Sequence, residues 1–131
     1  PGSAADVPLA MPVQWDAASV TESELAMLAA DDANRLIAVS RPAAELLGWE
    51  IEELIGRRIV SIVPEGLREA HIAGFVRYLV SGESRILGKT TLVSALRRDG
   101  SEVQVLILIE VWATGGRAVF TATLTPVELT G

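Results

Sequence analysis

The C-terminal part of the chain repeats one pattern, a strand-like apolar segment followed by a tight turn. The turns fall at Arg97-Arg98-Asp99-Gly100 and at Thr114-Gly115-Gly116-Arg117. The strand-like segments are residues 86–96, 102–112 and 118–125. Strands that follow one another through tight turns pair as an antiparallel meander. We therefore expect three neighbouring antiparallel strands in this part of the chain.

The middle segment of the meander has two faces of different character. Because side chains alternate along a strand, one face is entirely β-branched and suited to a core: Val103, Val105, Ile107, Ile109 and Val111. The other face includes Leu106, Leu108 and Trp112 and is too apolar to be left open to water. We expect that it is covered by the N-terminal arm, through Val13 and Trp15, or by a second copy of the chain in a homodimer.

Shorter elements precede the meander. Apolar segments on either side of Asp31-Asp32-Ala33-Asn34 predict a β-hairpin. Short helices are expected over residues 42–47 and 50–55, a further short segment over 59–63, and the longest helix over about 66–80, closed by Ser81-Gly82. The order of two strands, several short helices, one longer helix and three strands predicts a single α+β domain.

Composition excludes several classes of protein. Without cysteine, the chain cannot form a disulfide, a Cys-ligated metal site or a thiol nucleophile. The single histidine excludes a multi-His metal site within one chain. A net charge of −6 argues against a nucleic-acid partner. The apolar runs are far shorter than the roughly 20 residues that span a bilayer, so we expect a soluble cytoplasmic protein and no membrane partner.

The negative charge is concentrated at the N-terminus. Residues 1–30 carry four acidic residues and no basic one, and residues 4–13 include two prolines with no periodic pattern. We interpret Pro1-Gly2-Ser3 as a tag remnant, and residues 1–24 as this remnant with a linker and flanking arm. The folded domain is expected over residues 25–126, and 127–131 would begin a C-terminal linker to a longer protein.

Three motifs of the chain resemble those of PAS sensory domains. They are the stretch from Asn34 to Trp49, the stretch Glu52-Glu53-Leu54-Ile55-Gly56-Arg57, and the hairpin sequence Leu96-Arg97-Arg98-Asp99-Gly100-Ser101. The resemblance implies a five-stranded antiparallel sheet, with short helices and one longer helix over one face, that encloses a small-molecule site. Ser40-Arg41-Pro42 departs from the Asn-Pro pair common at the first helix of the family.

His71 occupies a defined place on the longest predicted helix. On a helical wheel it lies at the centre of an arc formed by Leu67, Gly74, Phe75, Tyr78 and Leu79. The side chain should therefore point toward the core or toward a cavity. One interpretation is a histidine at the core edge that is hydrogen-bonded to backbone or water, and the other is a ligand-binding histidine.

Around His71 the chain resembles the FixL-type haem branch of PAS domains. That resemblance implies haem b with His71 as its axial ligand, Arg77 near the propionates, and aliphatic residues over the distal face. The cofactor-binding residues it implies are His71, Gly74, Phe75, Arg77, Tyr78, Arg85, Ile86, Ile107 and Ile109. Thr91 stands where the branch carries its oxygen-responsive arginine, and threonine cannot supply that charged group.

The sequence favours a regulatory sensor over a catalyst. No GxSxG motif accompanies His71, and the acidic residues lie mostly at helix starts and turns, so we do not expect an enzyme. We expect a module that binds a small ligand or a partner and relays the change to an output domain outside this chain. The alternatives are a haem b gas or redox sensor and a ligand-free dimerisation module. Without cysteine, flavin photochemistry through a cysteinyl adduct is excluded, although a non-photochemical flavin is not.

Overall fold

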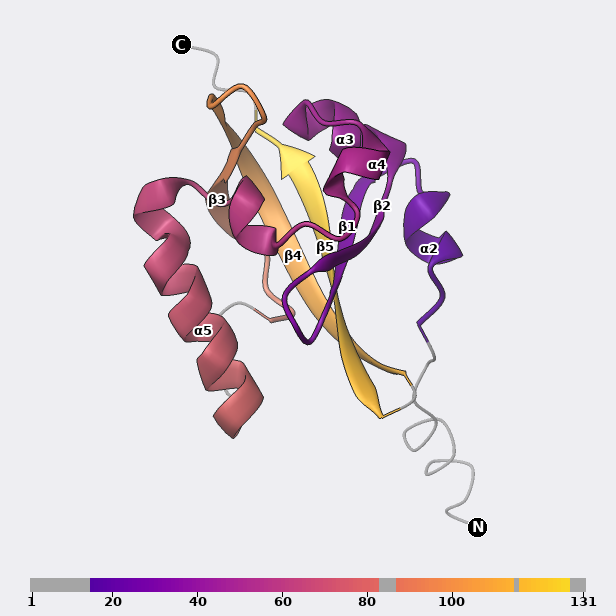
Figure 1. Cartoon of the computed structure of the whole chain (residues 1–131), viewed down its shortest axis with the longest axis vertical. Helices are drawn as coiled ribbons and strands as arrows, with labels where there is room; N and C mark the ends of the chain where they lie inside the picture. The colour runs from indigo at the N-terminus through magenta and orange to yellow at the C-terminus, as the bar shows by residue number, and fades with distance from the viewer. Residues whose placement is uncertain (1–14, 83–86, 115, 128–131) are drawn as a thin grey trace.

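The computed structural model describes residues 15–82, 87–114 and 116–127 and has one antiparallel sheet of five strands. The spatial order of the strands is β2-β1-β5-β4-β3, so β5, the last strand of the meander, pairs with β1 of the first hairpin in the middle of the sheet (Figure 1). The strands are β1 (Ala26–Asp31), β2 (Leu36–Val39), β3 (Thr91–Leu96), β4 (Glu102–Thr114) and β5 (Arg117–Pro126). The expected α+β class and five-stranded antiparallel sheet are confirmed.

The connection from β2 to β3 holds most of the helices. They are α3 (Arg41–Leu47), α4 (Ile51–Leu54), the 3-10 turns η1 (Ile59–Ile62) and η2 (Glu65–Leu67), and α5 (Arg68–Ser81). A separate short helix, α2 (Ala18–Thr21), precedes β1 and lies on the opposite side of the sheet from α3 and α4 (Figure 1). Among the described residues, no helix is long and apolar enough to cross a membrane.

Ser40 determines where α3 begins. Its buried hydroxyl accepts hydrogen bonds from the amides of Ala43, at 3.2 Å, and Met27, at 2.8 Å, and it donates to the carbonyl of Leu25 at 2.7 Å. The side chain therefore caps the helix and ties it to the start of β1. Gly48 ends α3 in the left-handed conformation, with a φ of 78°.

The main core lies between the inner face of the sheet and α3, α4 and η1. Its buried members are Leu28, Leu36, Val39, Ala43, Ala44, Leu47, Leu54, Ile62, Ala95, Val105 and Leu124. Val103 and Ile107 pack against this cluster from β4, as the β-branched face of that segment predicts. The N-terminal half of β4 thus contributes its inner face to the main core.

A second, smaller cluster lies on the outer face of the sheet. Val20 from α2 is completely buried there against Ala29, Ala38 and Val119. Trp15 and Trp112 both pack against this cluster, so the N-terminal segment covers the side of the outer face formed by β1, β2 and β5. Leu92 and Leu106, which are Cα partners across β3 and β4, remain 58% and 37% exposed.

Two details of the elements predicted from sequence are wrong. The strand expected from Ile86 begins at Thr91, because Gly88 adopts a φ of 74° and bends the chain before the sheet pairing starts. Leu87 and Gly88 instead contact β4, where the Gly88 amide donates to the carbonyl of Ile109 at 2.8 Å. The second concerns the side of α5 that was expected to face inward. Leu79 was placed on that side, but its side chain is 48% exposed.

Candidate functional site

A cavity of about 260 Å³ lies under α5, η1 and η2 against the inner face of the sheet. Strands β1, β3, β4 and β5 supply one wall, mainly through their alternating inward residues. The opposite wall comes from Ile59, Ile62, Val63, Leu67, His71 and Phe75. This volume lies close to the lower end of the range of about 300–1,000 Å³ that small-molecule sites occupy.

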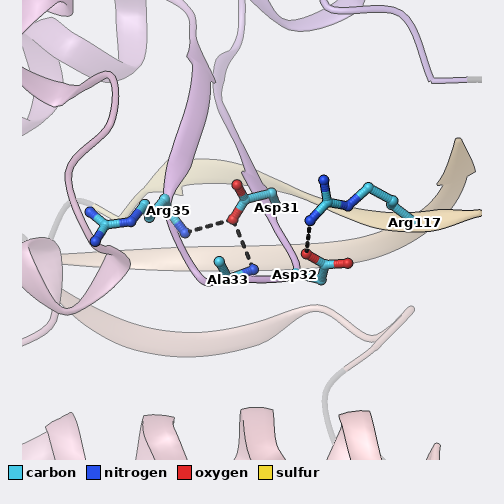
Figure 2. A network of polar contacts seen from close by, with 5 residues as sticks. All are labelled: Asp31, Asp32, Ala33, Arg35 and Arg117. Atoms are coloured by element: carbon cyan, nitrogen blue, oxygen red, sulfur yellow. Dashed lines mark hydrogen bonds and ion pairs between the residues drawn. The ribbon is translucent and has the colours of Figure 1, made fainter. Parts of the chain in front are cut away.

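Asn34 reaches the cavity from the turn between β1 and β2. Asp31 builds this turn, because one carboxylate oxygen accepts hydrogen bonds from the amides of Ala33, at 2.9 Å, and Arg35, at 3.1 Å (Figure 2). Asp32 points the other way and meets Arg117 at 3.5 Å (Figure 2). Asn34 itself has a φ of 64°, a left-handed conformation that asparagine tolerates better than most residues.

The side chains of Asn34 and His71 meet at the cavity. The Nε2 atom of His71 lies 3.3 Å from the Asn34 Nδ2 atom and 3.4 Å from the Asn34 Oδ1 atom. A neutral imidazole has one N–H, so Nε2 either accepts from the amide or donates to it. In each case His71 uses either the NH₂ group or the carbonyl oxygen of the Asn34 side chain, and the other group can still form a hydrogen bond.

Burial favours the neutral form of His71. Desolvation lowers the pKa of this imidazole from its ordinary value of 6.5, because the charged form loses hydration in the protein interior. No charged side chain is among the described residues that line the cavity. The site therefore offers hydrogen-bonding groups without a formal charge.

The other two polar lining residues direct their hydroxyls away from the cavity. The Thr121 hydroxyl accepts a hydrogen bond from Trp112 Nε1 at 2.9 Å, and Trp112 packs on the outer face. The Ser94 hydroxyl accepts from the side chain of Gln104, its partner across β3 and β4. Both residues thus belong to the outward-facing set of their strands, and Asn34 with His71 supplies the polar side-chain groups of the described cavity wall.

Helix α5 contacts the sheet through aromatic side chains as well as through His71. Phe75 and Tyr78 both meet Phe120 of β5 edge-to-face, with ring centroids 5.4 and 5.5 Å apart. Such pairs contribute about 0.5–1.5 kcal/mol beyond the area that they bury. No side chain of α5 is fully buried, so these contacts and the His71–Asn34 pair hold the helix over the cavity.

The structure gathers some of the site residues predicted from sequence and not others. His71, Phe75, Ile107 and Ile109 line the cavity together. Gly74, Arg77 and Tyr78 lie on α5 outside this lining, and Thr91 lies at the start of β3. Arg85, Ile86 and Val13 lie outside the described residues.

Sequence reasoning did not identify Asn34 as a site residue. The turn composition around it predicted the hairpin, but the pairing with His71 spans 37 positions of sequence. A conformational signal was available, because asparagine is enriched among residues that adopt positive φ in turns. That signal explains the turn and does not indicate the partner.

The described residues, as arranged here, do not fit a haem. The Nε2 atom that would bind iron is held by Asn34, and Arg77 is exposed and outside the cavity lining. A haem needs a vacant axial nitrogen and space for a planar macrocycle with two propionates, and a cavity of about 260 Å³ is small for such a group. The described residues also contain no group of three His, Cys, Asp or Glu side chains suited to a metal ion.

Comparison with known proteins gives the chain a family. The PAS fold family matches residues 22–121. An uncharacterized protein of Azorhizobium caulinodans is 33% identical over 98 residues, which cover 74% of this chain and 13% of that protein. The sensor protein FixL of Bradyrhizobium diazoefficiens is 30% identical over 96 residues, which cover 73% of this chain and 19% of FixL.

A solved structure gives the same result at the level of fold. The PAS domain of an HTR-like protein from Haloarcula marismortui superposes with a TM-score of 0.60 at 22% identity, covering 85% of this chain and 88% of that one. The matched part of the chain spans less than a fifth of the length of each of these two relatives. PAS domains are typical of sensor signalling proteins, of which FixL is one. The match to the family over residues 22–121 and the five-stranded sheet agree that this chain belongs to the PAS family.

Proposed function

We propose that this domain is a sensory module that binds a small molecule in the cavity beneath α5 and relays occupancy to an attached output domain. The observation that carries the proposal is the cavity of about 260 Å³ itself, which lies between the sheet and a helix none of whose side chains is fully buried. The pocket is partly open to solvent and almost entirely apolar in its described lining, and small-molecule sites are typically concave and mostly apolar. It is therefore more consistent with a binding site than with packing alone.

The relay would run through α5 and β5. Both elements line the cavity, and they touch each other through Phe75, Tyr78 and Phe120. A ligand that contacts this wall favours one packing of α5 against the sheet over another, which shifts the populations of the two. Strand β5 ends at Pro126, so a change in its position would be passed to the chain that follows.

The domain would act as a dimer through the outer face of the sheet. Leu92 and Leu106 form an exposed apolar pair on this face, and Leu108 lies two residues further along the same side of β4. The N-terminal segment covers the other side of the face through Trp15 and Val20. A second copy would remove the uncovered apolar surface from water.

The experiment uses naphthalene as an apolar probe of the cavity. We expect naphthalene to bind the unaltered chain in isothermal titration calorimetry and to increase the hydrogen-exchange protection of the amides of α5. Ala122→Leu fills the cavity from β5 and should abolish both effects. Thr123→Leu is the matched control, because the neighbouring side chain points to the outer face of the same strand.

Two results would contradict the proposal. If naphthalene binds equally well to the unaltered chain and to Ala122→Leu, the probe does not occupy this cavity. If neither naphthalene nor its hydroxyl derivative 2-naphthol binds, the pocket does not accept a small apolar guest. Circular dichroism of each variant establishes that the fold is kept.

A further inference from the structure

The cavity wall is apolar almost everywhere, and its polar groups are gathered at one point. The side chains of the four strands and of η1 and η2 present hydrocarbon, and the hydroxyls of Ser94 and Thr121 face away. Asn34 and His71 are therefore the side chains of the described wall that can hydrogen-bond to a guest. A guest would be oriented with a polar atom toward this pair and with hydrocarbon elsewhere.

The pair has hydrogen-bonding capacity to spare. Because His71 Nε2 is almost equidistant from the two polar atoms of the Asn34 amide, it can satisfy one of them and leaves the other available. The imidazole can exchange its tautomer and so present either an N–H or a lone pair at the same place. A hydroxyl group, which both donates and accepts, complements both states.

A charged guest does not match this wall. An ionised carboxylate or ammonium group buried without a counter-charge loses several kcal/mol or more of hydration. The described lining residues provide no cation or anion to offset this loss. The apolar residues that favour a hydrocarbon guest therefore disfavour a charged one.

We infer that the cavity takes an uncharged, largely apolar molecule with one hydroxyl-type group, which the Asn34–His71 pair recognises. The inference rests on the proposed function, since it names the class of ligand for the same cavity. The size of the guest follows from volume. A dry cavity of about 150 Å³ lined by Leu, Ile and Phe holds benzene, so about 260 Å³ is suited to a two-ring compound or a short-chain alcohol.

The test compares three probes of one ring system at neutral pH by isothermal titration calorimetry. The first is naphthalene, the unsubstituted hydrocarbon. The second, 2-naphthol, carries a hydroxyl group on the same ring system, and the third, 2-naphthoate, carries a carboxylate. A net hydrogen bond predicts that 2-naphthol binds the unaltered chain about 3- to 10-fold more tightly than naphthalene. We expect 2-naphthoate to bind more weakly than both.

Variants of the pair should remove this preference. His71→Phe keeps a ring of similar size and removes the nitrogen, and Asn34→Gly removes the amide while tolerating the left-handed turn. Because each single variant leaves a polar group of the other residue in the wall, the variant that carries both changes is expected to bring the ratio of the naphthalene and 2-naphthol dissociation constants close to one. Ser94→Ala is the control, since its hydroxyl contacts Gln104 on the outer face, and it should leave the ratio unchanged.

The outcomes separate this inference from the proposed function. Equal affinity of naphthalene and 2-naphthol for the unaltered chain, or tightest binding of 2-naphthoate, overturns the inference while the cavity remains a binding site. Binding of none of the three contradicts the proposed function itself. The three probes on the unaltered chain already decide the question, so it does not depend on the folding of any variant.

Discussion

Ser40 shows how one residue can join two elements. Its hydroxyl satisfies two amides and one carbonyl within a fully buried environment, where an unpaired polar group is costly. Ser40 precedes Arg41-Pro42, the pair in which the sequence departs from the Asn-Pro expected of PAS domains, and its side chain caps the helix. The departure from the family pattern therefore leaves the start of α3 intact.

Replacement of Ser40 by alanine should destabilise the domain by about 2–3 kcal/mol, since it leaves buried backbone groups of β1 and α3 without partners. Urea unfolding followed by circular dichroism measures the change in the free energy of unfolding. Ser23→Ala is the control, because that hydroxyl accepts a hydrogen bond near the surface from the amide of Leu25. Similar losses in both variants would contradict the argument.

The pKa of His71 predicts how stability depends on pH. Burial lowers this pKa in the folded state, so the unfolded chain binds the proton more readily. The contribution of His71 to the free energy of unfolding is therefore fully present above about pH 6.5, near the pKa of the unfolded chain. It is lost as the pH falls from there through the lower pKa that His71 has in the folded state. Urea unfolding over this range should show a steeper loss for the unaltered chain than for His71→Phe. Parallel curves for the two proteins would show that His71 does not contribute.

At the scale of elements, α5 and the β3–β4 hairpin differ in how firmly they are held. The hairpin turn docks on α3 and α4, where the Arg98 amide donates to the carbonyl of Leu47 at 2.9 Å and the Arg98 guanidinium meets Glu53 at 2.8 Å. Arg57 and Arg98 also stack against the ring of Trp49. Helix α5 has no fully buried side chain, which makes it the element most suited to move when the cavity is filled.

The elements themselves were largely predictable from sequence. Alternation in β4, turn residues between the strands, and Gly48 and Gly82 after helices are local signals, and the structure confirms the elements that they indicate. The true start of β3 was not predictable from residues 86–96, because the bend at Gly88 is stabilised by contact with Ile109 of the neighbouring strand. Long-range pairing decides such boundaries, and local propensity does not.

At the scale of the whole molecule, the outer face predicts self-association. We expect the unaltered chain to form a dimer in analytical ultracentrifugation, with the equilibrium dependent on concentration. Leu106→Lys places a charge within the exposed Leu92–Leu106 pair and should shift the chain to monomer without a comparable loss of thermal stability.

Ile72→Lys is the matched control for this prediction, because Ile72 is 48% exposed on α5, away from the outer face. It should leave the dimer unchanged. A chain that remains monomeric at high concentration, or a dimer that Ile72→Lys disrupts and Leu106→Lys does not, would contradict the assignment of this face.

By itself, the sequence determined the α+β class, the order of the elements and the inward face of β4, because periodicity and turn chemistry are local properties of the chain. It also placed His71 on the inward side of the longest helix. Only the tertiary structure decided that His71 meets Asn34, that Ser94 and Thr121 turn away, and that about 260 Å³ between them stays open. These facts depend on contacts between residues that are distant in sequence, and no local pattern encodes the distances between them.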